Sequence, residues 1–536
     1  MDRIPNAIAK DSGPHSAAMP SPPMILPTPA QATPTARLAS KDFHLAPARN
    51  TRSTANWLAW QIGGWTAFLG FLLALSGLLL ALVYGVGRLV ETLGGSFSLG
   101  QAIGNILALI LVLVMITATL LTMADRKWSA LMQDRVGPNR ARLPIPGLSN
   151  SPLAGLPHIL ADVFKMLFKE DFISEGAARH KLLFNLAPLF AFAPAFCLFA
   201  VVPVGPDVII DSAGRHVQLM VAHLDWGILY VFALASLGVF GTALAGWTSD
   251  NKLALLGGLR ASAQLVSYEV TLGLTLVGTF IVFGTLRLDE MVAAQGAPGL
   301  ILQRLPADPS LLWGVLPSWG FIFQPIGMLL FLVAAMAEIK RPPFDTPEGE
   351  SEIIGYFLEY SGLKSGMFLI AEYAETVVVA GIVTSMFLGG YHIPWFEPQL
   401  ARAFDRPGID GTLVLAVAQI FAFIVKMLAV IWVMFLARWA FPRFRYDQIM
   451  RLGWKMMLPI SLANVVVSAG VFLAGGREGL AVMGIVEWIA LLSFLGFSGR
   501  SPVKEAEGHG GDGHQVRDHD AAAAAHAQGA TAPAGH

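Results

Sequence analysis

The chain has 536 residues, of which 54% are hydrophobic and only 14% are charged, and its mean hydropathy is +0.59. A soluble domain would be about one quarter charged, so this composition excludes a soluble globular protein. The formal net charge of −1 argues against a nucleic-acid partner, and the single cysteine, Cys197, excludes both a disulfide framework and a cysteine-ligated iron–sulfur centre.

The two ends of the chain have low-complexity sequences. Residues 1–56 are rich in Pro, Ala, Ser and Thr, and residues 500–536 are rich in Gly, Ala and His. Such compositions bury too little apolar surface to fold. Both ends are therefore predicted to be disordered tails, and the function is expected to lie between them.

Apolar segments of membrane-spanning length follow one another between these tails. A helix of roughly 20 apolar residues spans the ~30 Å hydrocarbon core of a bilayer. The sequence therefore predicts an all-α, polytopic membrane protein. Its ten predicted transmembrane helices cover residues 66–87, 103–123, 182–203, 226–246, 262–283, 319–337, 366–389, 411–434, 457–475 and 480–497.

Lysine and arginine are unevenly distributed over the loops between these segments. The loops at 124–181, 247–261, 338–365 and 435–456 hold 19 basic residues, whereas the alternate loops hold 7. Cytoplasmic loops carry an excess of Lys and Arg. The four basic loops are thus predicted to be cytoplasmic, and with ten spans both termini are expected on the same side.

The first basic loop contains a segment with helical periodicity. Ile159, Val163, Phe164 and Leu167 recur at helical spacing around the polar Asp162. This pattern predicts an amphipathic helix that lies in the membrane interface. Such a helix is either a surface anchor or a doorway for an amphipathic, lipid-soluble ligand, and the spacing fits both interpretations.

Three acidic residues, Glu269, Glu372 and Glu375, lie inside predicted spans. A carboxylate in hydrocarbon costs ~2.5–3.5 kcal/mol on insertion scales, so these residues are expected to face the protein interior or a water path. They form either structural ion pairs, with Lys426 as one candidate partner, or a set of groups that exchange protons. One intramembrane lysine cannot pair with three acids, which favours proton handling.

The segment "AEIKRPPFDTPEGESEIIGYFLEYSG", residues 337–362, concentrates six further carboxylates. Its prolines preclude a continuous helix at its beginning. If the residues from Glu348 onward are helical, Glu348, Glu352 and Glu359 lie near one face. The segment is either an acidic surface or a cluster that shares protons with the intramembrane acids. Glu397, by contrast, is interpreted as an isolated surface acid.

Four separated blocks carry a resemblance to a known family. They are "DRKWSALMQDRVGPNR", "GWTSDNKLALLGGLRASAQLVSYEVTLGL", the acidic segment continuing to "FLIAEYAE", and "RWAFPRFRYDQIMRLGWKMMLP". In this order they resemble the H subunit of the proton-pumping NADH:quinone oxidoreductases, respiratory complex I, whose mitochondrial counterpart is subunit 1. No Walker A loop, dinucleotide fingerprint, zinc-protease motif or nucleophile elbow is found in the sequence.

The resemblance implies a bacterial inner-membrane subunit that forms the quinone-binding chamber and the start of an acidic proton path. The matching positions in the acidic path are Glu269, Glu338, Asp345, Glu348, Glu352, Glu359 and Glu372. Those in the chamber are Arg126, Asp162, Arg260, Arg341, Phe344, Arg438 and Arg443.

The resemblance further implies that the quinone, either ubiquinone or menaquinone, binds as substrate. No flavin, iron–sulfur cluster or metal is expected in this chain, and electrons would come from an iron–sulfur cluster in a neighbouring subunit. The implied partners are the hydrophilic quinone-module subunits, the small membrane subunits next to the chamber, and membrane lipid.

Several features depart from the family pattern. The family core of eight helices corresponds to residues 103–475, which leaves residues 57–102 and 476–499 as an extra helix at each end. Asp125 stands where many family members have Glu, so its role is left open.

Two other classes compete with this interpretation: the membrane subunit of an energy-converting hydrogenase without quinone, and a stand-alone proton antiporter. The arginine-bearing blocks favour the quinone enzyme, and the inverted repeat typical of antiporters is not seen.

Overall fold

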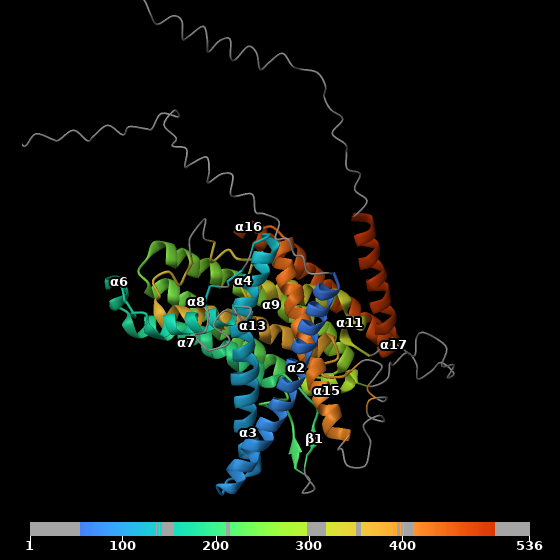
Figure 1. Cartoon of the computed structure of the whole chain (residues 1–536). Coiled ribbons are helices and arrows are strands. Elements are labelled where there is room, and N and C mark those ends of the chain that lie inside the picture. Colours follow the sequence, from blue (N-terminus) through green and yellow to red (C-terminus); the bar gives the residue numbers. More distant parts are fainter. Residues whose placement is uncertain are drawn as a thin grey trace, which may run out of the picture. The chain divides into compact units, whose positions relative to one another are not determined.

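A computed structural model describes residues 54–135, 137–138, 140–141, 155–210, 215–296, 318–349, 355–393, 397, 400 and 411–498. The chain divides into two units, residues 1–68 and 69–536, and only the beginning of the first helix belongs to the described part of the first unit. The second unit, which carries the candidate site described below, is built almost entirely from helices (Figure 1).

Most of the described residues belong to long apolar helices. These are α2 (Thr54–Thr92), the continuous helix α3 (Phe97–Asn105), η2 (Ile106–Met115) and α4 (Ile116–Met132), then α7 (Lys181–Cys197) with η4 (Leu198–Val201), α8 (Gly227–Thr248), α9 (Lys252–Phe283), α13 (Gly362–Phe387), α15 (Gly411–Ala440) and α17 (Leu458–Ser498). Shorter elements are α5 (Leu156–Phe168), α6 (Glu175–Ala178), α10 (Leu288–Gln295), α11 (Gly320–Phe323), α12 (Pro325–Glu338), α16 (Tyr446–Arg451) and η7 (Leu452–Met457). One antiparallel pair, β1 (Val208–Ile209) and β2 (His216–Val217), joins Val208 to Val217.

The predicted class, an all-α polytopic membrane protein, is confirmed. Within the described residues, eight helices are long and apolar enough to cross a membrane. Each of the ten predicted segments is mainly helical, but two regions differ from the expected form. The segment at 319–337 is broken at Gln324 into α11 and the 14-residue α12, which begins at Pro325. Proline is favoured in the first turn of a helix because its missing N–H would have no partner there.

The last two predicted spans are continuous in α17 apart from one residue. Gly476 has φ 59° and ψ −149°, a non-helical conformation that glycine adopts readily. Ser468 Oγ lies 3.9 Å from Met483 Sδ across this point. Residues 15 positions apart in a straight helix would be about 22 Å apart, so α17 is a hairpin of two arms.

The second arm of this hairpin packs against the broken segment. Trp488 Nε1 donates a hydrogen bond to the carbonyl oxygen of Phe321 at 3.1 Å, and the Glu487 carboxylate accepts one from the backbone N–H of Ile326 at 3.3 Å. The first turn of a helix leaves backbone N–H groups without intrahelical partners. Glu487 therefore satisfies one such group at the beginning of α12, where no water from the bilayer core is available.

The centre of the second unit is formed by α7, α8, α9, α12 and α13, which pack against one another in the order α13, α7, α8, α9, α12. Small residues allow close approach. A Cβ on Gly246 of α8 would lie 2.9 Å from the Cα of Gly258 on α9. Close backbone contact through small residues is typical of membrane helices.

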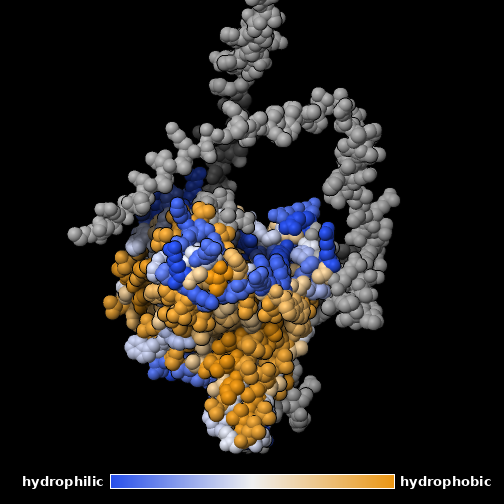
Figure 2. Space-filling model, turned by 90° about the vertical axis from the view of Figure 1, so that its left-hand side faces the viewer, coloured by the Kyte–Doolittle hydropathy of each residue, from blue (hydrophilic) through white to orange (hydrophobic). Residues whose placement is uncertain are grey.

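The surface agrees with a membrane location. Figure 2 shows hydrophobic residues over the middle of this face and hydrophilic residues gathered at one end. The predicted amphipathic helix is also confirmed, because α5 exposes Leu160, Phe164, Leu167 and Phe168, the last with 84% of its surface accessible. Such a helix is expected at the bilayer interface.

Candidate functional site

Asp125, at the end of the membrane-spanning part of α4, is the centre of a buried ionic cluster. Only 6% of its surface is exposed. Its Oδ2 atom accepts hydrogen bonds from Arg438 Nη1 and from the Tyr373 hydroxyl, the latter at 3.0 Å. Arg341 Nη1 lies 3.7 Å from the same oxygen. Residues from three of the four basic loops thus meet at one acid.

Arg341 connects this acid to a second one. Its Nη2 atom lies 3.4 Å from Glu372 Oε2, and its Cζ lies 3.9 Å from the centroid of the Tyr373 ring. Glu372 is 5% exposed. Removing one partner from a buried ion pair leaves an uncompensated charge. The guanidinium is therefore held in place by two carboxylates and an aromatic face.

Asp345 and Glu348 lie in the loop between α12 and α13. Asp345 forms an ion pair with Arg443, which precedes α16. Burial raises the pKa of Asp345 to about 6, although the positive charge of Arg443 opposes this shift. For Glu348, burial and then the negative charge of Glu372 raise the pKa well above its ordinary value. Both carboxyls can therefore bind protons near neutral pH.

Several polar atoms of this cluster are buried without a hydrogen-bonding partner among the described residues. They are Asp125 Oδ1, Arg341 Nε and Nη2, Asp345 Oδ1 and Glu348 Oε1. A cavity of about 20 Å³, lined mainly by apolar residues, lies beside Arg341 and Arg438. Buried polar groups in proteins are nearly always satisfied by protein or ordered water. The cluster thus retains hydrogen-bonding capacity for water or for polar atoms of a ligand.

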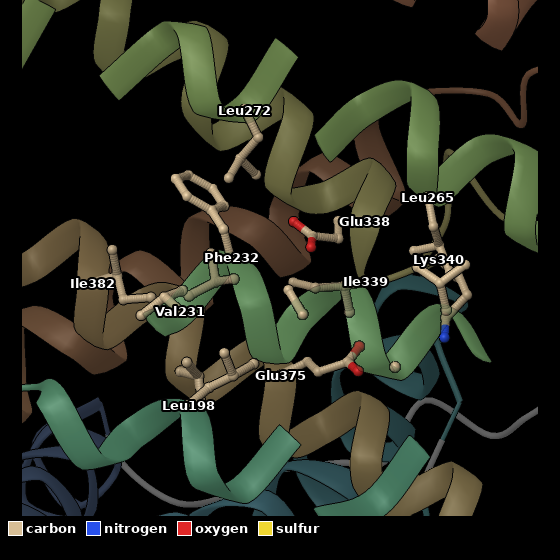
Figure 3. Close-up of a pocket in the computed structure, with 15 residues that line it drawn as sticks. Leu198, Val231, Phe232, Leu265, Leu272, Glu338, Ile339, Lys340, Glu375 and Ile382 are labelled. Carbon is tan, nitrogen blue, oxygen red and sulfur yellow. The ribbon is translucent and has the colours of Figure 1, made fainter. Parts of the chain in front are cut away.

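A second space of about 60 Å³ lies where α8, α9, α12 and α13 meet. Figure 3 shows Glu338 and Glu375 reaching it from α12 and α13, with Lys340 at its edge. The remaining walls are apolar and include Leu198, the aromatic Phe232, and aliphatic side chains from α8, α9 and α13. Charged groups in such surroundings interact strongly because the local dielectric is low.

Glu269 extends this group of acids. Its Oε1 atom accepts a hydrogen bond from the Ser236 hydroxyl on α8, and its charge acts on Glu338. Glu372 and Glu375 are one helical turn apart on α13, so that helix joins the ionic cluster to the cavity. The acids can hold and exchange protons. No group of three His, Cys, Asp or Glu residues suited to a metal ion occurs in the described part of the chain.

The remaining predicted chamber residues have separate partners. Arg126 Nη1 lies 2.5 Å from Asp162 Oδ2, which links α4 to the exposed amphipathic helix α5. Arg260 Cζ lies 5.8 Å from the ring centroid of Tyr446. Phe344 is buried, and its ring centroid lies 5.6 Å from that of Phe444. The structure thus places Arg126 and Asp162 together. It brings Arg341, Arg438, Arg443 and Phe344 to the buried ionic cluster around Asp125 and Asp345, here named the loop cluster.

Two predicted members of the acidic path are not placed with the others. Glu359 accepts a hydrogen bond from Asn251 Nδ2 at 2.8 Å, at the beginning of α9, and contacts no other acid within the described residues. Glu352 lies outside the described residues. The described residues at 339–349 and 355–361 are turns, bends and irregular chain, so neither Glu348 nor Glu359 lies in the helix that would have aligned them.

Two other interpretations of the sequence are wrong. Lys426 does not pair with the intramembrane acids, since it donates hydrogen bonds to the carbonyl oxygens of Leu388, Gly390 and His392. These carbonyls follow the C-terminal end of α13, where unpaired carbonyls attract a cation. Glu397 is not an isolated surface acid, since it lies 3.2 Å from His392 Nδ1 and also accepts a hydrogen bond from Gln419.

Sequence reasoning finds the roles of three site residues only in part or not at all, although it singles out Glu375 as an intramembrane acid. The sequence leaves the role of Asp125 open and assigns Lys340 and Glu375 neither to the chamber nor to the acidic path. A signal exists for Glu375, which follows Glu372 by three positions and therefore shares its helix face. For Lys340 and Asp125, the contacts depend on packing between distant segments.

The chain is similar to known proteins over most of its length. The family model described as NADH dehydrogenase matches residues 104–469. An H subunit of the NADH-quinone oxidoreductase of Geobacter metallireducens is 39% identical over 375 residues, which cover 68% of this chain and 95% of that protein. The H subunit of the NADH-quinone oxidoreductase of Salinibacter ruber is 38% identical over 364 residues, covering 68% and 94%. "NADH-quinone oxidoreductase subunit 8" of Rhodothermus marinus is 39% identical over 362 residues, covering 67% and 94%. Helix α2 and the second arm of α17 lie outside the family match.

Proposed function

The chain belongs to the NADH dehydrogenase family, and from this premise we propose that it is the membrane subunit of a respiratory NADH:quinone oxidoreductase that couples quinone reduction to proton translocation. The observation that carries the proposal is the row of buried acids that begins beside Arg341 and continues along α13 into the cavity. Buried carboxyls that are close together bind and release protons near neutral pH.

The loop cluster is proposed as this chain's wall of the quinone chamber. Arg341, Arg438 and Arg443 supply cationic hydrogen-bond donors, and unsatisfied donors at Arg341 are available to the oxygen atoms of a quinone. Phe344 adds an apolar surface. The two cavities near these residues measure about 60 and 20 Å³, whereas ligand pockets are roughly 300–1,000 Å³. The rest of the chamber is therefore assigned to hydrophilic subunits that cover the loops.

The entry to this chamber is assigned to α5 and its contacts. The exposed apolar face of α5 suits a helix in the bilayer interface, where a lipid-soluble quinone would approach. The ion pair between Arg126 and Asp162 fixes α5 to α4. Arg260, on α9 next to Tyr446, is included on the basis of the family resemblance.

The acidic path is proposed to run from Asp345 and Glu348 through Glu372 and Glu375 to Glu338 and Glu269. Each step is supported by contact or electrostatic interaction between neighbouring members. Glu352 stays in the proposal on the family pattern. Glu359 has no structural support as a member, because Asn251 is its partner.

The proposed setting is a bacterial inner membrane, with both termini in the cytoplasm and with neighbouring membrane subunits next to the acidic path. Electrons reach the quinone from an iron–sulfur cluster of a hydrophilic subunit, since this chain is proposed to hold no redox centre. Its own residues bind and orient the quinone and conduct protons. The oxidoreductase activity thus belongs to the assembly.

Purification of the native assembly, followed by labelling with a photoreactive quinone, tests this proposal. We expect flavin and iron–sulfur subunits to purify with the chain, and the label to attach to the segment 337–345 and to compete with unlabelled quinone. The segment 284–296, which lies in an alternate loop, serves as the internal control. Copurification of a nickel subunit, or of no partner, would contradict the proposal in favour of a hydrogenase-type complex or a stand-alone transporter.

A further inference from the structure

Lys340 is a buried cation that has no counter-ion among the residues that the structure describes. It is 5% exposed, and its ammonium group forms no hydrogen bond or ion pair with any of these residues. Tyr356 contacts it through an aromatic face, with the ring centroid 5.7 Å from Nζ. Its backbone φ is +62°, a left-handed conformation that is unfavourable for a residue other than glycine. Conformations of this kind persist where the surrounding structure requires them, and they cluster at functional sites.

The side chain of Lys340 lines the cavity that also contains Glu338 and Glu375 (Figure 3). Its positive charge acts on the carboxyls of Glu338, Glu375 and Glu348. A further charged group, Glu269 on α9, acts electrostatically on Glu338, and its carboxylate accepts a hydrogen bond from the neutral Ser236 of α8. The cavity therefore brings one ammonium together with carboxyls from two helices, α12 and α13.

The cavity is large enough and polar enough to hold water. A water molecule needs roughly 10–15 Å³ of such volume and two to four polar partners, so about 60 Å³ has room for about four molecules. A buried ammonium without a protein acceptor requires water in its place, because an unsatisfied buried charge is strongly unfavourable.

We propose that Lys340 and Glu375 are proton-holding residues of this cavity, in which water bridges the ammonium to the carboxyls of Glu375 and Glu338 and one proton is shared between the two acids. This inference rests on the proposed function, adds Lys340 to its acidic path, and gives Glu375 and Glu338 a shared proton. One cation neutralises one carboxylate, and in low dielectric the second carboxyl retains its proton.

This charge balance gives the cavity a relay step. A proton that arrives at the ionised carboxylate of Glu375 from Glu372 makes that group neutral, and the proton held by Glu338 leaves toward Glu269. The proton on Glu375 then moves to Glu338, and this transfer restores the first arrangement. The net charge of the cavity is the same before and after the complete cycle.

Two substitutions remove different parts of this arrangement. Glu375→Gln keeps the size and hydrogen-bonding capacity of the side chain but leaves only the Lys340 and Glu338 pair, with no proton to share. Lys340→Met keeps the length of the side chain and the same backbone strain but removes the cation, so both acids retain their protons. Lys340→Arg preserves the charge and serves as the conservative variant.

The experiment uses the intact complex in sealed vesicles. It measures quinone-dependent NADH oxidation, proton uptake, and the infrared C=O stretch of protonated carboxyls that shifts in deuterated water. We expect both activities to fall at least about tenfold in Glu375→Gln and Lys340→Met. The infrared band should shrink in Glu375→Gln and grow in Lys340→Met, and Lys340→Arg should retain most activity. A structural role for Lys340 would not increase the number of protonated carboxyls.

Glu290→Gln is the matched control, because the Glu290 side chain on α10 is half exposed, and this variant should behave like the parent. NADH oxidation with an artificial hydrophilic acceptor reports assembly, and Glu375→Gln carries the test alone if Lys340→Met does not assemble. Parent rates and a parent infrared band in the assembled variants would overturn the inference. If Glu372→Gln is inactive while these variants are active, only the added residues are wrong. If Glu372→Gln is also fully active, the proposed function itself fails.

Discussion

One guanidinium, that of Arg341, faces Glu372 and Asp125 at the same time. Its two terminal nitrogens lie 3.4 Å from Glu372 Oε2 and 3.7 Å from Asp125 Oδ2. Glu372 belongs to the row of acids on α13, whereas Asp125 belongs to the loop cluster on α4. A change of charge next to Arg341 therefore alters the electrostatic environment of Glu372 directly. In the proposed function, this relationship is the physical link by which quinone reduction at the loops affects protons inside the membrane.

Replacement of Arg341 or Arg443 by Ala is expected to weaken quinone reduction. Each change removes a cationic donor and leaves a buried carboxylate, Glu372 or Asp345, without its partner. We expect the rate of quinone-dependent NADH oxidation in membranes to fall at least about tenfold, on the scale of one lost charge-assisted interaction of about 1.5–3 kcal/mol. NADH oxidation by an artificial hydrophilic acceptor should be unchanged, because electron entry is proposed to lie in other subunits.

Arg88→Ala is the matched control for these two variants. Arg88 forms an exposed ion pair with Glu91 at 3.0 Å near the end of α2, far from the cluster in sequence. Exposed pairs contribute little, so both activities should remain at the parent level. Equal loss of the two activities in Arg341→Ala or Arg443→Ala would indicate failed assembly and would leave the chamber without support.

Asp345 is expected to titrate near pH 6. Burial raises its pKa to about 6, and Arg443 opposes this shift, so the carboxyl loses its proton as the pH rises from about 5 to 7. In Arg443→Ala the opposing positive charge is absent, and the pKa should therefore rise above that of the parent. The Asp345 carboxyl band, identified in infrared spectra by its loss in Asp345→Asn, should reach half intensity at a higher pH in Arg443→Ala. A midpoint that stays the same or moves downward would show that Arg443 does not control this group.

Both termini are predicted to face the cytoplasm, because ten spans and the distribution of basic residues agree. With Cys197 replaced by Ala, single cysteines at Pro20 and Gln515 lie in segments outside the described residues. A membrane-impermeant thiol reagent should fail to label Pro20→Cys and Gln515→Cys in intact cells and should label both in opened vesicles. Labelling of only one position in intact cells would mean that the number of spans is odd.

The positions of the helices could be predicted because hydrocarbon thickness sets their length and excludes charge. The same rule could not find where a helix stops inside the bilayer. Apolar residues lie on both sides of Gln324, and the break there is stabilised by Glu487 from the far end of the chain, 161 positions from Ile326. The turn at Gly476 could have been predicted, because two glycines separate the last two apolar segments.

The sequence predicts a site residue where placing that side chain inside a membrane helix costs free energy. Glu269 and Glu372 stand out because a carboxylate in a membrane helix needs a reason to be there. Asp125 and Arg438 are 313 positions apart, and no local pattern connects them. Glu359 looks like a member of the acidic segment but is bound by Asn251 from another loop. Lys340 looks like part of a basic pair with Arg341, yet only helix packing shows that it lines a cavity with two acids.

The choice of control follows from the same contacts. Glu397 is unsuitable as an inert acid because His392 and Gln419 bind it. Glu290 is also contacted, by Thr285 and Arg287, but its side chain is 51% exposed whereas that of Glu397 is 25% exposed. Because Glu290 also lies in an alternate loop, Glu290→Gln is the appropriate control for substitutions in the acidic path. It should leave assembly, quinone reduction and proton uptake at parent levels.

Proton uptake by sealed vesicles that contain the assembled complex with Glu372→Gln or Glu269→Gln is the most direct measurement. Glutamine keeps the shape and the hydrogen-bonding capacity of glutamate but cannot release a proton. We predict normal assembly, loss of most quinone-coupled NADH oxidation and proton uptake, and substantial retention of both in the corresponding Glu→Asp variants. If both glutamine variants take up protons at the parent rate during full turnover, the buried carboxylates are structural and the proton path is contradicted.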